Sequence, residues 1–251
     1  MSSVPWRLCV RLFPTSPPFI YTISMLQGIS AVAFDLDGTL YPTYRLNIRL
    51  LPFLCRHGRL IAALGKARTI IRHEQEQSPS FTMPNFHQYQ AEITANLLRA
   101  QPEQIKEKIN NLIYRGWERY FSKIKLFPHV WELLAELRAA RLKLGLLSDF
   151  PPKTKLENLN LADCWDVVLC SEDTGSIKPS IRPFMELAKA LECTPEQILY
   201  VGNSRRYDMA GAGRAGMKTA LLVGRFAGKR GKTGADFTFH DYRQLRDFVL
   251  H

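Results

Sequence analysis

The stretch AVAFDLDGTLYP, residues 31–42, places two carboxylates, Asp35 and Asp37, directly after a run of apolar residues. A short apolar run of this kind, bounded by turn residues, is typical of a buried strand. Two like charges at one strand end repel each other, and a strand end without a chemical task does not usually carry them. The stretch therefore predicts a first strand at residues 30–35 that delivers two acids to a functional edge.

Strands and helices alternate in the second half of the chain. Short β-rich runs at 142–149, 165–172, 197–203, 218–224 and 235–240 are separated by helical stretches such as VWELLAELRAARL and IRPFMELAKALE. Such alternation indicates a parallel sheet covered by helices on both faces. Together with the first strand, it predicts an α/β fold of about six strands, doubly wound and Rossmann-like.

Residues 43–125 do not follow this alternation. They contain three stretches with helical periodicity, separated mainly by the loop SPSFTMPN at 78–85: RLLPFLCRHGRLIAALGKARTIIR, FHQYQAEITANLLRA and PEQIKEKINNLIYRGWERYFSKI. The pattern predicts an all-helical domain at 43–125, inserted into a core domain made of residues 29–42 and 126–251.

The first 28 residues are interpreted as an N-terminal extension. Residues 1–24 are apolar and basic, but Pro14, Pro17 and Pro18 interrupt them, and they show no clear cleavage site of a signal peptide. Met25 stands just before the first strand. An equally good hypothesis is that translation starts at Met25.

Composition excludes several classes of protein. With 251 residues, 46% of them hydrophobic, the chain can build a core. Its five cysteines form an odd set without a CxxC pair, which argues against a disulfide framework or a zinc site and predicts reduced thiols in the cytoplasm. No run approaches 18 uninterrupted apolar residues, so no transmembrane helix is expected.

The net charge of +11 is concentrated in residues 43–125, which hold 14 Lys and Arg against 6 Glu and no Asp. A basic segment suits an anionic small molecule, a nucleic acid, an anionic membrane surface or simply a solvated helix face, and charge alone does not separate these. The loop at 224–234 adds Arg225, Lys229, Arg230 and Lys232. Because no known nucleic-acid module is recognisable and helix packing explains the amphipathic pattern, we expect neither a nucleic acid nor a membrane as the partner.

Polar residues follow the predicted strands at four places. Besides the two acids of the first strand, these are Ser148 and Asp149, Lys178 in SIKPS, and Asn203 and Asp208 in GNSRRYD. In a doubly wound sheet, ligands bind beyond the carboxyl ends of the strands. Four segments are therefore expected to bring their polar groups to a single rim.

This set of groups matches the requirements of phosphoryl transfer, which needs a nucleophile, a divalent cation, donors to the phosphate oxygens and a general acid. Asp35 suits the nucleophile, and Asp37 suits the group that protonates the leaving oxygen and then activates water. Mg²⁺ between the acids would offset their repulsion. Gly38 permits a tight turn beside a phosphate, and Ser148 and Lys178 can bind its oxygens.

The segments FDLDGTLYP, LLSD, SIKPS and VGNSRRYDMAGAGRAGM resemble the four motifs of the haloacid dehalogenase-like (HAD) hydrolase superfamily over residues 29–42 and 126–245. The resemblance implies a Rossmann-like core, dependence on Mg²⁺ and an aspartyl-phosphate intermediate. It also implies two ligand sets, a metal set of Asp35, Asp37, Asn203 and Asp208 and a phosphate-binding set of Gly38, Ser148, Asp149 and Lys178.

The resemblance also points to one branch of the superfamily. True haloacid dehalogenases lack the second acid because they displace halide, so Asp37 favours a phosphatase or a phosphotransferase. The helical segment lies between the first and second motifs, which is typical of subfamily I with a C1 cap. Such a cap is expected to close over the site and to set specificity.

The chain departs from the family pattern at two positions. Asn203 stands where the fourth motif usually has an acid, which removes a negative charge from the metal site, and Asp149 stands where Asn is common. We hypothesise that Asp149 compensates for Asn203, which requires it to lie near Asp35. The glycines of MAGAGRAGM (209–217) fall inside a helical pattern, which argues against a dinucleotide fingerprint. Arg205 and Arg206 suit either phosphate steering or solvent.

The sequence thus predicts a Mg²⁺-dependent phosphatase that hydrolyses a small phosphorylated metabolite through an aspartyl-phosphate. Two alternatives remain: a phosphotransferase or mutase with the same residues, and a binding or regulatory protein weakened by Asn203. Neither the substrate nor the oligomeric state follows from the sequence.

Overall fold

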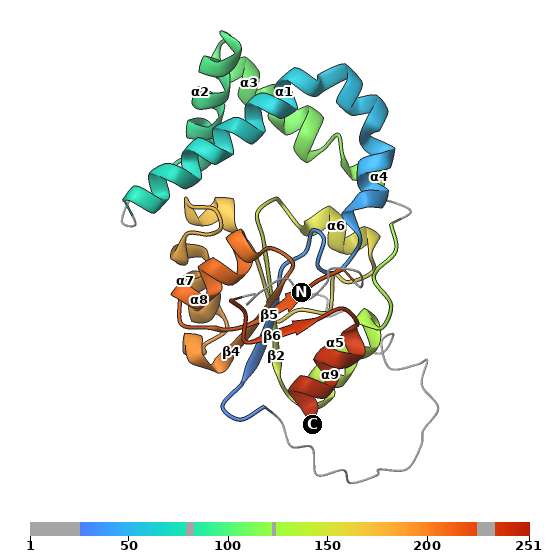
Figure 1. The fold of residues 1–251 in the computed structure, drawn as a ribbon. Coiled ribbons are helices and arrows are strands. Elements are labelled where there is room, and N and C mark those ends of the chain that lie inside the picture. Colours follow the sequence, from blue (N-terminus) through green and yellow to red (C-terminus); the bar gives the residue numbers. More distant parts are fainter. Residues whose placement is uncertain (1–25, 79–82, 122–123, 225–233) are drawn as a thin grey trace, which may run out of the picture.

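The structure is a computed structural model that describes residues 26–78, 83–121, 124–224 and 234–251 (Figure 1). The predicted N-terminal extension up to residue 25, part of the predicted loop at 78–85, and the four basic residues expected at 225–232 lie outside the described residues.

A parallel sheet of six strands forms the centre of the molecule. Its order is β3-β2-β1-β4-β5-β6. The strands are β1 (Ala31–Phe34), β2 (Lys143–Ser148), β3 (Val167–Cys170), β4 (Ile198–Gly202), β5 (Lys218–Leu222) and β6 (Phe237–Phe239). Each lies within the run that predicts it, and every pair is parallel. The predicted doubly wound α/β fold is confirmed.

Strand β1 occupies the position at which the strand order reverses, between β2 and β4. All four of its residues are fully buried, as expected for a parallel strand covered on both faces. Because ligands in doubly wound sheets bind outside the carboxyl ends at such a switch point, the residues after Phe34 are in the position for a site.

Helices cover both faces of the sheet (Figure 1). On one face, Val32 and Phe34 belong to a core that includes residues of α5 (Val130–Ala139) and α9 (Tyr242–Leu250). On the other face, Ala31 and Ala33 pack in a core with residues of α7 (Ile181–Ala190) and α8 (Ala210–Arg214). This alternation follows from the two-residue period of a strand. Shorter elements connect these layers: α6 (Lys153–Asn158), η2 (Ser171–Thr174), η3 (Pro195–Gln197) and η4 (Arg205–Met209).

The chain between β1 and β2 forms a helical insertion, residues 43–121, which lies together at one end of the molecule (Figure 1). It contains α1 (Thr43–Gln77), α2 (Phe86–Leu98), α3 (Pro102–Lys108), the π-helix η1 (Ile109–Tyr114) and α4 (Glu118–Phe121). Helix α1 begins earlier than its periodicity predicts and kinks at His57, ahead of the poor helix former Gly58. The insertion has a small core of its own, built from residues of α1, α2, α3 and η1.

None of the helices in the described ranges combines the length and the apolar character that crossing a bilayer requires.

Candidate active site

Asp35 follows β1 directly, and its carboxylate is held from two sides. The Thr39 hydroxyl donates to Oδ2 at 2.7 Å, and Lys178 Nζ donates to Oδ1 at 2.6 Å. Only 6% of Asp35 is exposed. Thr39 can reach back to Asp35 because the chain turns sharply at Gly38. The predicted nucleophile is therefore fixed in position at the carboxyl edge of the sheet.

Lys178 connects the first and fourth motifs. Its ammonium lies 2.6 Å from Asp35 Oδ1 and 2.7 Å from Asp208 Oδ1, and all three side chains are buried. Burial alone would lower the pKa of Lys178, but the charges of Asp208 and Asp35 outweigh it and hold that pKa well above its ordinary value. Lys178 is therefore a fixed positive charge between two acids.

Burial raises the pKa of Asp35 to about 7, because desolvation, together with the charges of Asp208 and Asp37, outweighs the attraction of Lys178. A nucleophilic carboxylate must be ionised. The Lys178 ammonium is shared by two acids, Asp35 and Asp208, which leaves this triplet with excess negative charge that a further cation would offset.

Asp208 is held by the backbone as well as by Lys178. Its Oδ2 accepts from the amide nitrogens of Asn203 at 3.2 Å and Ser204 at 3.0 Å. Ser204 also caps η4, with Oγ accepting from the Tyr207 amide at 3.1 Å. The loop after β4 is thus ordered around the second acid of the fourth motif.

Asp37 lies two residues beyond Asp35, and its carboxylate contacts two side chains of the described part of the chain. The Tyr41 hydroxyl donates to Oδ1, and Lys155 Nζ of α6 donates to Oδ1 at 2.8 Å and to Oδ2 at 2.5 Å. The side chain of Lys155 is only 12% exposed. Sequence reasoning did not predict Lys155, because a lysine in a short helix after the second motif has no signal that distinguishes it from a solvated one.

Gly38 is required by the geometry of this turn. Its φ is +88°, which favours glycine, and a Cβ at this position would lie 2.1 Å from Asn203 Nδ2. The Asn203 side chain therefore packs directly on the backbone of the first motif. Its Nδ2 donates to the Asp37 carbonyl oxygen at 3.4 Å.

The oxygen donors that the sequence assigns to a metal are close to one another. Lys178 brings Asp35 and Asp208 together, and Asn203 contacts the Asp37 carbonyl. Within the described part of the chain, no three His, Cys, Asp or Glu side chains gather as a metal site. A set with only two carboxylate side chains, completed by a carbonyl and an amide oxygen, is chemically suited to Mg²⁺.

Ser148 ends β2 and Asp149 follows it directly, but their side chains face different groups. Ser148 is fully buried, and its Oγ accepts from the Phe150 amide at 3.3 Å. Asp149 Oδ1 accepts from Ser171 Oγ at 2.5 Å and from the Lys178 amide at 3.1 Å. The Asp149 carboxylate therefore stabilises the loop that carries Lys178 by accepting a hydrogen bond from its backbone.

Two arginines of the helical insertion also bind Asp149. Arg72 Nη2 lies 2.9 Å from Oδ2, and Arg68 Nη2 lies 3.6 Å from Oδ2 and donates to the Asp149 carbonyl at 3.1 Å. Arg72 Nε further donates to the Lys178 carbonyl at 2.8 Å. We hypothesised that the negative charge of Asp149 compensates for Asn203. In the structure this charge is paired with the two arginines. Arg68 and Arg72 are four positions apart and therefore share one face of α1. This spacing was the signal in the sequence that could have indicated a shared acidic partner.

Arg68 continues into a buried network that sequence reasoning also missed. It pairs with Glu172 of η2, whose side chain is fully buried, and donates to Gln90 Oε1 at 3.0 Å. The Tyr114 hydroxyl donates to Glu172 Oε2 at 2.9 Å. Burial raises the pKa of Glu172 although Arg68 lowers it. This network joins α1, α2 and η1 of the insertion to the core.

The remaining sequence features lie outside this cluster. Arg205 and Arg206 are exposed. Gly211 packs tightly, since a Cβ there would lie 2.3 Å from Phe184, whereas Gly213 has open space around it.

The chain is similar to several known proteins. A model of the haloacid dehalogenase-like hydrolase family matches residues 32–222. A phosphoglycolate phosphatase of Salmonella paratyphi A is 29% identical over 221 residues, covering 80% of this chain and 84% of the relative. A glyceraldehyde 3-phosphate phosphatase of Methanopyrus kandleri is 28% identical over 202 residues, with coverages of 77% and 84%. The crystal structure of a HAD phosphatase from Thermococcus onnurineus superimposes with a TM-score of 0.60 at 26% identity, covering 88% of this chain and 98% of that one.

Proposed function

Since this chain belongs to the haloacid dehalogenase-like hydrolase family, we propose that it hydrolyses a small phosphorylated metabolite through an aspartyl-phosphate on Asp35. The family match confirms the predicted superfamily and hydrolase class, and the relatives named phosphatases support a phosphoric monoester hydrolase. The observation that carries the proposal is the buried triplet of Asp35, Lys178 and Asp208, because it holds a carboxylate and a fixed ammonium at one point of the sheet edge.

In the first step, an oxygen of Asp35 attacks phosphorus, and the bond between phosphorus and the leaving oxygen breaks. Lys178 and Ser148 are the groups proposed to bind the phosphate oxygens, together with the backbone at Gly38. Lys178 is held so firmly by Asp35 and Asp208 that its charge needs little reorganisation as negative charge develops.

Asp37 is proposed to act as the general acid in the first step and as the general base in the second. It gives a proton to the leaving oxygen as the ester bond breaks, and then takes a proton from the water that attacks the aspartyl-phosphate. That second attack releases inorganic phosphate and restores the Asp35 carboxylate. Tyr41 and Lys155 hold the Asp37 side chain for this task.

Asp35, Asp208, Asn203 and the Asp37 carbonyl are proposed to hold Mg²⁺. When bound, this ion neutralises charge on the phosphate and on the acids of the site. Loss of one carboxylate at Asn203 predicts weaker metal binding than a site with a third acid would have.

The helical insertion is proposed to act as the cap. Its α1 arginines bind Asp149 and the Lys178 carbonyl, so closure of the insertion and positioning of Lys178 are mechanically connected. A closed cap would exclude bulk water during the first step. We further propose a cytoplasmic location, which suits the free thiols of Cys55, Cys164, Cys170 and Cys193.

The test is turnover of para-nitrophenyl phosphate, phosphoglycolate and glyceraldehyde 3-phosphate with and without Mg²⁺, using Asp35→Asn as the inactive control. We expect metal-dependent release of phosphate that the substitution abolishes, and acid-stable trapping of labelled phosphate on Asp35 in rapid-quench experiments. Appearance of phosphate on added acceptor alcohols, rather than in water, would instead support a phosphotransferase. Binding of these esters without any turnover would favour a regulatory protein.

A further inference from the structure

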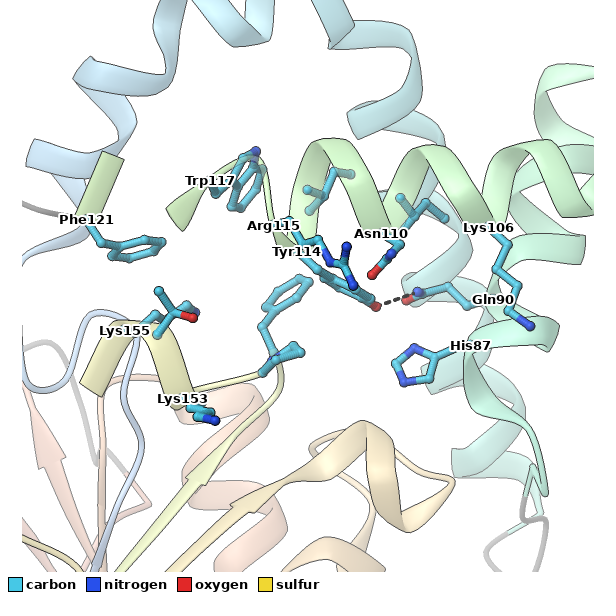
Figure 2. Close-up of a pocket in the computed structure, with 15 residues that line it drawn as sticks. His87, Gln90, Lys106, Asn110, Tyr114, Arg115, Trp117, Phe121, Lys153 and Lys155 are labelled. Carbon is cyan, nitrogen blue, oxygen red and sulfur yellow. Dashed lines mark hydrogen bonds between the residues drawn. The ribbon is translucent and has the colours of Figure 1, made fainter. Parts of the chain in front are cut away.

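A cavity of about 430 Å³ lies between the helical insertion and the core (Figure 2). Its upper wall comes from α2, α3, η1 and the segment up to Phe121, and its lower wall from residues 150–155. Sites for small molecules typically have volumes of about 300–1,000 Å³. A leaving group as small as glycolate would fill only a minor part of this space.

The cavity adjoins the group that must meet the leaving oxygen. Lys155 lines the cavity, and its ammonium contacts both carboxylate oxygens of Asp37. Because a general acid has to lie within hydrogen-bond reach of the oxygen that it protonates, the leaving group must start beside Asp37. The cavity lies next to Asp37 on the side of the helical insertion, where a leaving group can be accommodated.

Aromatic rings form much of the cavity wall. Phe150 of the core meets Tyr114 at a centroid distance of 6.2 Å and Trp117 at 6.5 Å. The Lys155 ammonium lies 5.4 Å from the Phe121 ring and 5.6 Å from the Phe150 ring. Such rings offer faces and edges to a planar, unsaturated group, whereas a short aliphatic chain gains little from them.

The charged side chains that line the cavity, among the described residues, are all basic. Lys106 and Arg115 reach it from the insertion, and Lys153 and Lys155 from the core (Figure 2). None of the described residues that line it is Asp or Glu. Lys106, Arg115 and Lys153 are exposed and therefore lie at the rim, while Lys155 is mostly buried beside Asp37. Aromatic walls complement an aromatic ring, and basic side chains at the rim complement an anionic substituent on that ring, opposite the phosphate ester.

We propose that the substrate is a phosphomonoester whose leaving group is an aromatic ring bearing a second anionic substituent, with the ring against Trp117 and Phe150 and the anion beside Arg115. This inference rests on the proposed phosphatase function and narrows its substrate class.

The test compares four phosphomonoesters: para-carboxybenzyl phosphate, benzyl phosphate, cyclohexylmethyl phosphate and phosphoglycolate. The first three have similar primary alcohols as leaving groups, so differences in kcat/KM report on the cavity. We expect kcat/KM for benzyl phosphate to exceed that for cyclohexylmethyl phosphate about fivefold, because the aromatic wall favours a planar ring. The carboxylate of para-carboxybenzyl phosphate should raise kcat/KM about another tenfold through a charge-assisted contact.

Variants locate the effect. Arg115→Met should reduce the ratio of kcat/KM for carboxybenzyl over benzyl phosphate about tenfold, since the charge-assisted contact is lost. Trp117→Leu should reduce the ratio for benzyl over cyclohexylmethyl phosphate. Arg59→Met is the matched control, because Arg59 is exposed on α1 and does not line the cavity.

The outcomes separate the two proposals. If phosphoglycolate is hydrolysed best and the ring and carboxylate bring no gain, the inference is overturned and the phosphatase function stands. If no ester is hydrolysed, calorimetric measurement of the affinity for the same esters decides between the two proposals. Preferential binding of the carboxybenzyl ester would keep the cavity assignment and overturn the phosphatase function, and equal or absent binding would overturn both.

Discussion

Arg72 of the helical insertion lies 2.9 Å from the Asp149 carboxylate of the core, and the same guanidinium donates to the carbonyl of Lys178. The ion pair therefore joins the insertion to the residue that bridges Asp35 and Asp208. Arg72 also stacks at 4.3 Å over the Tyr207 ring of η4, so one side chain contacts three segments of the core edge.

Replacing Asp149 by Asn should destabilise the protein by about 2 kcal/mol, because Arg68 and Arg72 lose a partly buried carboxylate. Urea denaturation measures this change in the free energy of unfolding. In a double-mutant cycle, Arg72→Met and Asp149→Asn should be less than additive by about 1 kcal/mol. Additive effects would show that the two residues act independently, and Arg59→Met serves as the control for loss of an exposed arginine.

The stabilisation by Asp149 should depend on pH. Burial would raise its pKa, but Lys178, Arg68 and Arg72 outweigh burial and hold that pKa below the ordinary value of 3.8. A carboxylate whose folded-state pKa is depressed stabilises above the unfolded pKa and loses this contribution as pH falls through the folded pKa. The stability difference between wild type and Asp149→Asn should be constant above about pH 5 and shrink below the ordinary pKa. A difference that grows in acid would contradict the ion pair.

Substituting Lys155 by Met should impair proton transfer by Asp37, because within the described ranges of the chain Tyr41 would be the remaining side-chain partner of this carboxylate. We expect kcat/KM for benzyl phosphate to fall about tenfold, and that for para-nitrophenyl phosphate to fall less, because nitrophenolate leaves without protonation. Lys66→Met, on an exposed position of α1, is the control. Equal losses on both esters would assign Lys155 to phosphate binding instead.

Gly38→Ala should abolish most activity and destabilise the protein by about 2 kcal/mol or more, since it combines a positive φ with a clash against Asn203. Gly28→Ala is the matched comparison: its φ is +79°, but a Cβ there has nothing within 4 Å. That variant should cost about 1 kcal/mol from backbone strain alone and retain activity. Thermal unfolding and turnover of para-nitrophenyl phosphate check both variants.

Asn203→Asp should strengthen Mg²⁺ binding about tenfold, because a carboxylate adds charge to an oxygen donor set that now has two carboxylates. Calorimetric titration of the metal, without substrate, measures this directly. The substitution also removes the hydrogen bond from Asn203 Nδ2 to the Asp37 carbonyl, so kcat is followed separately. Unchanged metal affinity would place Mg²⁺ away from this side chain.

The positions of the strands along the chain and the location of the site edge were accessible from sequence, because both follow from local patterns. Alternating apolar runs predict parallel strands, and the carboxyl ends of parallel strands share one edge. Hence Asp35 and Lys178, which are 143 residues apart along the chain, were expected at one rim together with Asp208, and the structure joins the three through a single ammonium.

The helical insertion shows where local patterns stop being informative. Periodicity predicts that α1, α2 and α3 are helices, but it carries no information about how this unit is oriented on the core. The partners of Asp149 and Asp37 depend on that orientation and on the path of the chain after β2. Arg72 is 77 residues from Asp149, and Lys155 is 118 residues from Asp37.

The sequence by itself determined the doubly wound core and the acids at its edge, because these depend on residue period and motif spacing along the chain. Only the tertiary structure decided that Asp149 pairs with Arg68 and Arg72, that Lys155 holds Asp37, and that aromatic and cationic side chains enclose a cavity beside it. The physical reason is that these contacts arise between elements whose relative placement is set by the packing of the whole molecule.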